Sequence, residues 1–256
     1  MENHRLSGEK QLNIALSLSG GAARGAFHLG VLEAFEKTGI VVKAISGSSI
    51  GAIIATSYAS GVSPREQLEI FKSKAFKKSF KFNYFKNGLF SVDKKRDVLK
   101  QLAPIDDISN TDIKLHITAV DLISGDIKRF DKGDPITLCL ASSALVPIFE
   151  PISYHDMELV DGGVLDNMPV QPLKQYDLPI FGVDLHPEQK GYKNTVTGII
   201  KRTIFIAWRA SVLRNKKDCN LYITHPDLRK FSLFSFKKLD DMYKLGLETG
   251  LKLTEY

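Results

Sequence analysis

Residues 40–55 have the sequence Ile-Val-Val-Lys-Ala-Ile-Ser-Gly-Ser-Ser-Ile-Gly-Ala-Ile-Ile-Ala, and this stretch decides the fold. An apolar run ends at a serine between two glycines, and a second apolar run follows. The order predicts a strand, a sharp turn at Ser49 and then a helix. Gly47 and Gly51 flank the serine because a side chain at either position would crowd the turn. The helix N-terminus favours negative charge near the hydroxyl, so the pattern indicates a nucleophile for acyl transfer.

A strand and a helix also precede this stretch. Leu12 to Leu18 predicts a buried strand that ends at Ser19-Gly20-Gly21. Ala23 to Lys37 has helical spacing and stops at Gly39. This β-α-β-α order predicts an α/β fold of three layers, a mostly parallel central sheet flanked by helices on both faces.

The remaining elements follow from apolar periodicity and from capping and turn residues. We expect helices that open at Ser63-Pro64, near Asp93 and at Asp134-Pro135, a long amphipathic helix over Asn194 to Lys217 with Lys201, Arg202, Arg209 and Arg214 on a basic face, and a closing helix over Ser235 to Leu253. We expect strands over Leu115–Leu122, Ile127–Phe130, Tyr154–Val160, Leu178–Leu185 and Leu221–Thr224. No repeat or linker divides the chain, so residues 1–256 are predicted to form a single domain.

The composition is that of an ordinary globular protein, with 256 residues, 43% hydrophobic and 25% charged. Cys139 and Cys219 lie far apart and in no metal-ligand spacing, which favours a reducing compartment. The polar N-terminus leads into no apolar signal core, and no run of about 18 apolar residues exists. We therefore expect a cytoplasmic protein without a metal or cofactor.

One segment concentrates positive charge in a chain whose net charge is +6. From Ile70 to Val92 there is no acidic residue, and lysines alternate with aromatic residues. Such a segment suits peripheral contact with an anionic membrane surface and a role as a lid. The residues that would carry this contact are Lys77, Lys78, Lys81, Phe80 and Phe82. The alternative is a surface segment whose phenylalanines pack inward; no nucleic-acid-binding motif accompanies it, and nucleic acid is not an expected partner.

The glycine-rich loop Ser19-Gly20-Gly21-Ala22-Ala23-Arg24-Gly25 lies between a predicted strand and a predicted helix. A P-loop would need lysine and then serine or threonine after Gly25, where the chain has Ala26-Phe27. A dinucleotide fingerprint would need glycine at Ala22. The loop therefore serves either as an oxyanion loop or as a tight turn.

Asp161 is the candidate base, in the sequence Leu159-Val160-Asp161-Gly162-Gly163. A strand carries the aspartate to its end, and Gly162 and Gly163 let the backbone bend away. A turn aspartate would have the same local pattern. Because an ordinary aspartate pKa near 3.9 makes a poor base, the site would have to raise it or hold the carboxylate against the serine.

Taken together, these motifs resemble the patatin-like phospholipases. The resemblance rests on Ser-Gly-Gly-x-x-Arg-Gly, Gly-x-Ser-x-Gly and Asp-Gly-Gly in this order, and on residues 141–151 and 161–170. It implies that Ser49 is the nucleophile and Asp161 its direct partner, in a dyad without histidine. The oxyanion role would fall on the amides of Gly20, Gly21 and Ala22, with Arg24 and Gly25 bordering the loop. The implied reaction is hydrolysis of a phospholipid or lysophospholipid acyl ester, without a metal.

The chain departs from the family pattern at Ala22 and Asp166, and two alternatives to a dyad hydrolase stay open. If residue 22 needs a positive φ, Ala22 costs roughly 1 kcal/mol there, and Asp166, if close to Asp161, would raise its pKa. The first alternative is an α/β-hydrolase triad of Ser49, Asp161 and either His186 or His225, although each histidine alone is more often a surface or loop residue. The second is a lipid-binding module without turnover. The sequence leaves the head group, the acyl chain and the oligomeric state open.

Overall fold

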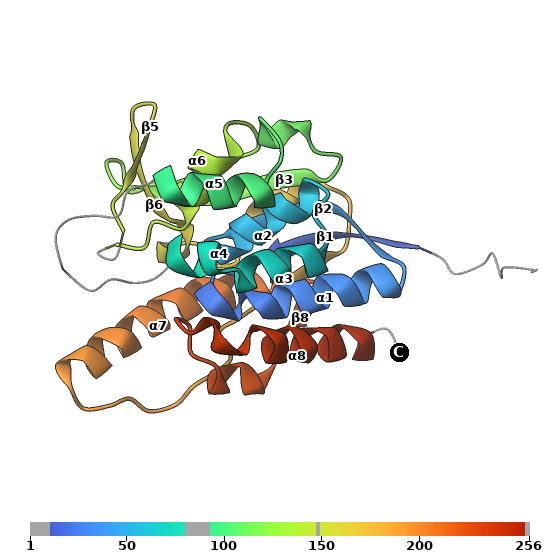
Figure 1. Ribbon diagram of the computed structural model, residues 1–256. Helices are drawn as coiled ribbons and strands as arrows, with labels where there is room; N and C mark the ends of the chain where they lie inside the picture. Colours follow the sequence, from blue (N-terminus) through green and yellow to red (C-terminus); the bar gives the residue numbers. More distant parts are fainter. Residues whose placement is uncertain (1–10, 80–92, 147–148, 254–256) are drawn as a thin grey trace, which may run out of the picture.

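The computed structural model describes residues 11–79, 93–146 and 149–253 (Figure 1). Within them, eight strands form one mixed sheet in the order β5-β6-β3-β2-β1-β7-β8, with β4 paired to β3. The strands are β1 (Leu12–Leu18), β2 (Ile40–Ser48), β3 (Lys114–Asp121), β4 (Ile127–Phe130), β5 (Ile152–Tyr154), β6 (Met157–Asp161), β7 (Ile180–Val183) and β8 (Leu221–Ile223). From β3 to β8 the neighbours are parallel, which confirms the mostly parallel sheet.

The helices follow the capping residues of the sequence. They are α1 (Ala26–Lys37), α2 (Ile50–Ala59), α3 (Pro64–Lys72), α4 (Lys74–Ser79), α5 (Asp93–Leu102), α6 (Pro135–Ser142), α7 (Val196–Lys216) and α8 (Leu239–Lys252). Short 3-10 turns include η1 (Ala22–Gly25), η3 (Gly162–Val164), η4 (Gln171–Gln175) and η5 (Pro226–Lys230). Ser63 caps α3 in a capping box with Glu66, and Asp134 caps α6, so the predicted starts of these helices are confirmed.

The sheet is covered on both faces, but unequally. Alternate residues of a strand point to opposite faces, so Leu16 and Ala15 of β1 belong to different cores. The larger core contains side chains of α1, α2, α3, α4, α5, α6 and α8. The smaller core on the other face contains Met168, Leu173 of η4 and Val212 of α7. The glycine-rich loop and the turn at Ser49 directly follow the parallel strands β1 and β2, so they lie at the same end of the sheet.

Helices α1 and α8 approach each other closely through glycines. A Cβ atom added at Gly30 of α1 would lie 2.0 Å from the carbonyl oxygen of Tyr243. One added at Gly246 of α8 would lie 2.1 Å from the carbonyl oxygen of Phe27. Both distances are too short for any side chain, so the two helix backbones pack directly against each other. The closing helix predicted from the sequence is thereby fixed to the first helix.

Strands β2 and β6 pair with the same edge of β3, at different positions along it. At Ile117, β2 and β4 pair with opposite edges of β3, and at Ala119, β4 and β6 do so. Strand β6 therefore lies on the same edge as β2, beyond its end. This places Asp161, the partner of Ala119, beside the turn that follows β2.

The sequence prediction of one strand over Tyr154–Val160 is wrong. The chain forms a hairpin of β5 and β6, and His155 turns between them with a φ of 55°. The polar pair His155-Asp156 is long enough for a tight turn, which the alternating pattern concealed.

The basic aromatic segment packs inward where it is described. Phe71 and Phe76 are each 1% exposed, and their rings contact each other at 4.6 Å between centroids. Lys77 of α4 is half-buried. Phe80, Lys81, Phe82 and the side chain of Lys78 lie outside the described residues, and their lid role stays a prediction. For Phe71 and Phe76, the inward-packing alternative is confirmed.

Candidate active site

Ser49 occupies a strained turn between β2 and α2. Its φ of 55° and ψ of −127° lie in a region that residues with a side chain rarely adopt. The flanking glycines make this turn possible. A Cβ at Gly47 would lie 2.3 Å from the carbonyl oxygen of Gly51, and one at Gly51 would lie 2.3 Å from that of Leu18. The turn predicted from the Gly-x-Ser-x-Gly pattern is therefore present.

The buried side chain of Ser142 holds this turn in place. The Ser49 amide donates to Ser142 Oγ at 2.9 Å, and Ser142 Oγ donates to the carbonyl oxygen of Thr118 at 2.6 Å. One hydroxyl at the end of α6 thus connects the turn to β3. The sequence analysis quoted this segment but gave Ser142 no role. A polar residue in an apolar helix was the available signal.

The carboxylate of Asp161 contacts the Ser49 side chain directly. It accepts a hydrogen bond from the Ser49 hydroxyl and another, of 2.7 Å, from the Gly163 amide. Burial raises the pKa of Asp161 to about 6, against these two hydrogen bonds, which lower it. The carboxyl group is thus tuned towards neutral pH, as a base at this site requires.

Of the residues after Asp161, the two glycines allow a tight turn, and Asp166 binds side chains other than Asp161. A Cβ at Gly162 would lie 2.3 Å from the carbonyl oxygen of Thr118, and one at Gly163 would lie 2.7 Å from Asn167 Oδ1. The Asp166 carboxylate binds Arg129 at 2.8 Å and accepts from Asn215. The raised pKa of Asp161 therefore comes from burial and not from repulsion by Asp166.

The glycine-rich loop offers two amides to the site. The Gly20 amide donates to the carbonyl oxygen of Asn167 at 3.0 Å, so the expected oxyanion role cannot include it in this conformation. The amides of Gly21 and Ala22 have no partner among the described residues, and both residues line the pocket with Ser49. Ala22 has a φ of 48°, the strained conformation that the sequence analysis considered.

Arg24 fastens the loop to two distant segments. Its Nη1 donates to the carbonyl oxygen of Leu185 at 2.9 Å, and its Nε and Nη2 donate to that of Phe231 at 3.0 and 2.8 Å. Burial lowers the pKa of Arg24 to about 10, while Asp184 opposes the shift. Gly25 leaves room for α2, because a Cβ there would lie 2.5 Å from Ile50 Cγ1. Arg24 and Gly25 thus border the loop as expected.

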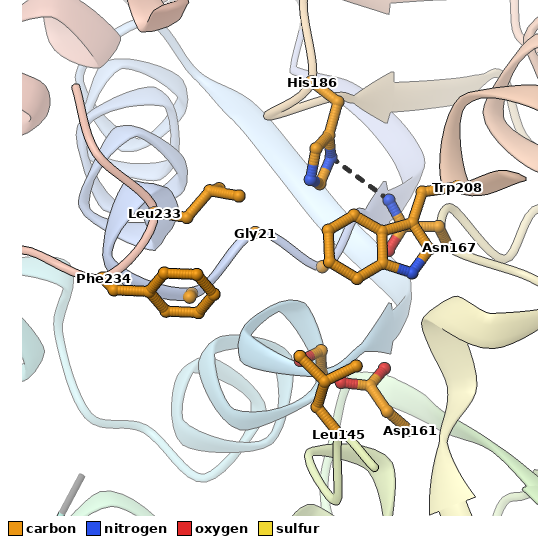
Figure 2. Close-up of a pocket in the computed structure, with 11 residues that line it drawn as sticks. Gly21, Leu145, Asp161, Asn167, His186, Trp208, Leu233 and Phe234 are labelled. Carbon is orange, nitrogen blue, oxygen red and sulfur yellow. Dashed lines mark hydrogen bonds between the residues drawn. The ribbon is translucent and has the colours of Figure 1, made fainter. Parts of the chain in front are cut away.

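A small pocket, partly open to solvent, connects these groups. Figure 2 shows Leu233 and Phe234 on one side of the pocket, Asn167 and Trp208 on the other, and Leu145 and Asp161 below Trp208. Its lining comprises Gly20, Gly21, Ala22, Ser49, Leu145, Asp161, Asn167, His186, Trp208, Leu233 and Phe234. The apolar walls come from segments to which the sequence analysis assigned no role.

His186 lies in a loop after β7, one of the two placements expected for it, but it is buried and lines this pocket. It is 1% exposed, and its Nδ1 lies 3.2 Å from Asn167 Nδ2 (Figure 2) and 3.6 Å from Asp184 Oδ1. Its Nε2 has no hydrogen-bond partner among the described residues. His225 instead caps η5, accepting from the Asp227 amide.

Two searches of the described residues gave negative results. No group of three or more histidine, cysteine, aspartate or glutamate side chains there could hold a metal ion, and Cys139 and Cys219 are free thiols. None of the described helices combines the length and apolar character needed to cross a membrane.

Comparison with known proteins agrees with this geometry. Residues 16–174 match the patatin-like phospholipase family. Lysophospholipase NTE1 of Lodderomyces elongisporus is 25% identical over 94% of this chain and 19% of its own length. An uncharacterized NTE family protein of Mycobacterium bovis is 28% identical over 66% of this chain and 48% of its own. The chain thus spans about a fifth to a half of the length of these curated relatives.

A solved structure shares the fold. VipD from Legionella pneumophila aligns with a TM-score of 0.51 and 12% identity, over 97% of this chain and 67% of VipD. The family match covers more than half of the 256 residues and includes both Ser49 and Asp161. The chain belongs to the patatin-like phospholipase family.

Proposed function

We propose that this chain is a serine acyl hydrolase that cleaves lipid acyl esters through an acyl-enzyme on Ser49. One observation carries the proposal: the Ser49 hydroxyl donates to a buried carboxylate, Asp161, whose pKa is raised to about 6. An aligned nucleophile and base, next to unpaired backbone amides, are the parts that acyl transfer needs.

The reaction would run in two halves at this pair. Ser49 Oγ attacks the acyl carbonyl carbon while Asp161 accepts its proton. The negative charge on the carbonyl oxygen is stabilised by the amides of Gly21 and Ala22 and by the N-terminus of α2. Asp161 then gives the proton to the leaving alcohol. In the second half, Asp161 takes a proton from the water that attacks the acyl carbon, and it returns this proton to Ser49 Oγ as the ester bond breaks and the fatty acid leaves.

The substrate class follows from the pocket walls and the relatives. Leu145, Trp208, Leu233 and Phe234 suit an acyl chain beside the serine. The similarity to NTE1 proteins, which are named lysophospholipases, extends over almost the whole of this chain. We therefore propose a phospholipid or lysophospholipid substrate, cleaved in the manner of a phospholipase A or lysophospholipase.

The test compares the wild type with Ser49→Ala and Asp161→Asn. A fluorophosphonate probe should label the wild type and not Ser49→Ala, and both variants should lose at least about 10³-fold in kcat/KM for lysophosphatidylcholine. Folding is checked by circular dichroism. Unlabelled wild type that is correctly folded would instead favour the lipid-binding module.

The triad alternative has its own test, because His186 lines the pocket. Asparagine at residue 186 would keep a polar atom near Nδ1 but could not act as a base. We expect His186→Asn and His225→Ala to keep kcat within about tenfold of the wild type, whereas loss of a triad histidine typically costs 10³-fold or more. A loss of that size in folded His186→Asn would replace the dyad by a triad.

A further inference from the structure

Helix α7 extends beyond the body of the protein with an apolar surface. Figure 1 shows it running outward from the sheet, and only Ser211 and Val212, near its C-terminal end, are buried. Six aliphatic side chains of this helix are exposed, and we call them the outer face of α7. They are Val196 (75% exposed), Ile199 (46%), Ile200 (53%), Ile204 (40%), Ile206 (53%) and Leu213 (49%).

Helix α7 binds the body through two arginines and leaves aliphatic side chains exposed. The side towards the body carries Arg202 and Arg209, which donate to the carbonyl oxygens of Gln189 and His186 at 2.9 and 2.7 Å. Arg209 also binds the buried Asp184 at 3.2 Å. At about 3.6 residues per turn, Val196, Ile200 and Ile204 lie on the side of the helix away from these arginines, whereas Ile199, Ile206 and Leu213 lie next to them. A helix that turns arginines to the body and leaves isoleucines exposed marks an interaction surface.

The charge around this face identifies the kind of partner. Residues 189–217 contain no aspartate or glutamate and eight basic residues: Lys190, Lys193, Lys201, Arg202, Arg209, Arg214, Lys216 and Lys217. Lys190, Lys193 and Lys201 are exposed. Exposed lysines beside aliphatic side chains suit a bilayer surface with anionic head groups. A second copy of the chain is a poorer match, because a symmetric contact would bring two such acid-free segments together.

The helix that carries the outer face also supplies one wall of the pocket of Ser49. Trp208, on the same helix, lines that pocket, and Phe234, 44% exposed, lines it from the opposite wall. A lipid that leaves a bilayer beneath α7 would therefore meet the pocket within the length of the same helix. We propose that the outer face of α7 docks on anionic lipid bilayers and so presents their lipids to Ser49. The docking step stands without turnover, whereas the delivery step rests on the proposed function.

Vesicle binding by the Ser49→Ala protein tests docking without hydrolysis. The vesicles are phosphatidylcholine alone or with 30% phosphatidylglycerol, at low and high salt. We expect binding to the mixed vesicles that falls with salt, and at least tenfold weaker binding for Ile199→Glu/Ile206→Glu. The matched control is Leu122→Glu/Ile123→Glu, since these side chains are 58% and 69% exposed in the β3–β4 turn. Trp208 is the only tryptophan of the chain, so brominated lipids should quench its fluorescence on binding.

The outcomes separate docking from function. Equal binding by both double variants, or none by the parent protein, overturns the docking proposal. So does a parent dimer that Ile199→Glu/Ile206→Glu converts to monomer without any vesicle binding. With Ser49 intact, Ile199→Glu/Ile206→Glu should lose at least tenfold in vesicle hydrolysis and keep the hydrolysis of a soluble butyrate ester. Vesicle binding without any ester hydrolysis by the wild type would refute the proposed function and leave docking intact.

Discussion

At the scale of single residues, the buried carboxyl group of Asp161 lowers the stability of the protein at neutral pH. Burial raises its pKa from 3.8 to about 6, so the folded state binds this proton more tightly than the unfolded state. The resulting stabilisation is complete below pH 3.8 and is lost as the pH rises through about 6. Above that range the free energy of unfolding is about 3 kcal/mol lower than it is below pH 3.8, because the charged carboxylate is buried. The hydroxyl of Ser49 and the amide of Gly163 lower this penalty.

Asp161→Asn should therefore stabilise the protein in a pH-dependent way. At pH 8 asparagine avoids burying a charge, and we expect a midpoint of thermal unfolding several degrees above that of the wild type. At pH 5, where Asp161 is largely protonated, the gain should be much smaller. Asp166→Asn is the control, since it breaks the ion pair with Arg129 and should lower the midpoint. A gain of equal size at both pH values would contradict the assigned pKa.

The catalytic candidates could be predicted from the sequence, but the residues whose hydrogen bonds hold them in place could not. Ser49 and Asp161 each follow a strand and adjoin glycines, so local pattern locates them. Asn167 contacts the loop through the Gly20 amide, and Ser142 reaches Ser49 from a helix that begins 86 residues after it in the chain. Such contacts depend on which strand edges meet, which no local pattern states. The occupation of the Gly20 amide could not be foreseen for the same reason.

At the scale of elements, the contact between α1 and α8 depends on two glycines. Side chains at Gly30 or Gly246 would overlap backbone atoms at 2.0 and 2.1 Å, so the helices would have to separate. Such overpacking usually costs about 1–3 kcal/mol. It exceeds the roughly 1 kcal/mol that alanine gains over glycine inside a helix.

We expect Gly246→Ala to lower the midpoint of thermal unfolding by several degrees, because 1 kcal/mol shifts it by about 2–4 °C in a chain of this size. Glu248→Ala is the control on the same helix, since its carboxylate is 53% exposed and makes only a weak ion pair with Lys244. Differential scanning calorimetry measures both. A midpoint raised by Gly246→Ala would mean that helix propensity outweighs the close contact.

Element boundaries were predicted well where caps exist. Ser63-Pro64 and Asp134-Pro135 begin α3 and α6 as expected, because side chain and proline both act within one turn. The β5–β6 hairpin was missed, since its turn has neither glycine nor proline. For α7 the amphipathic pattern was visible, but which side meets the body depends on Asp184 and the carbonyl groups around it.

At the scale of the whole molecule, the two coverings of the sheet differ in kind. Seven of the described helices contribute to the larger core, whereas the smaller one depends on η4 and the end of α7. The sequence predicted helices on both faces from the β-α-β-α order. It could not predict this imbalance, because the order of elements does not state how far a helix projects.

The short pairing of β6 with β3 bears on how the protein would lose activity. Three residue pairs join β6, the strand that carries Asp161, to β3. Ser49 instead follows β2, which is paired along both edges. A short ladder can open locally at a lower free energy than the whole sheet unfolds. In rising urea we expect ester hydrolysis to disappear before far-ultraviolet circular dichroism changes, and the Val160 amide to exchange its hydrogen faster than that of Ile45. Coincident urea midpoints would show instead that the hairpin belongs to the same cooperative unit as the central strands. With separate midpoints, the base would leave the nucleophile while the rest of the molecule stayed folded.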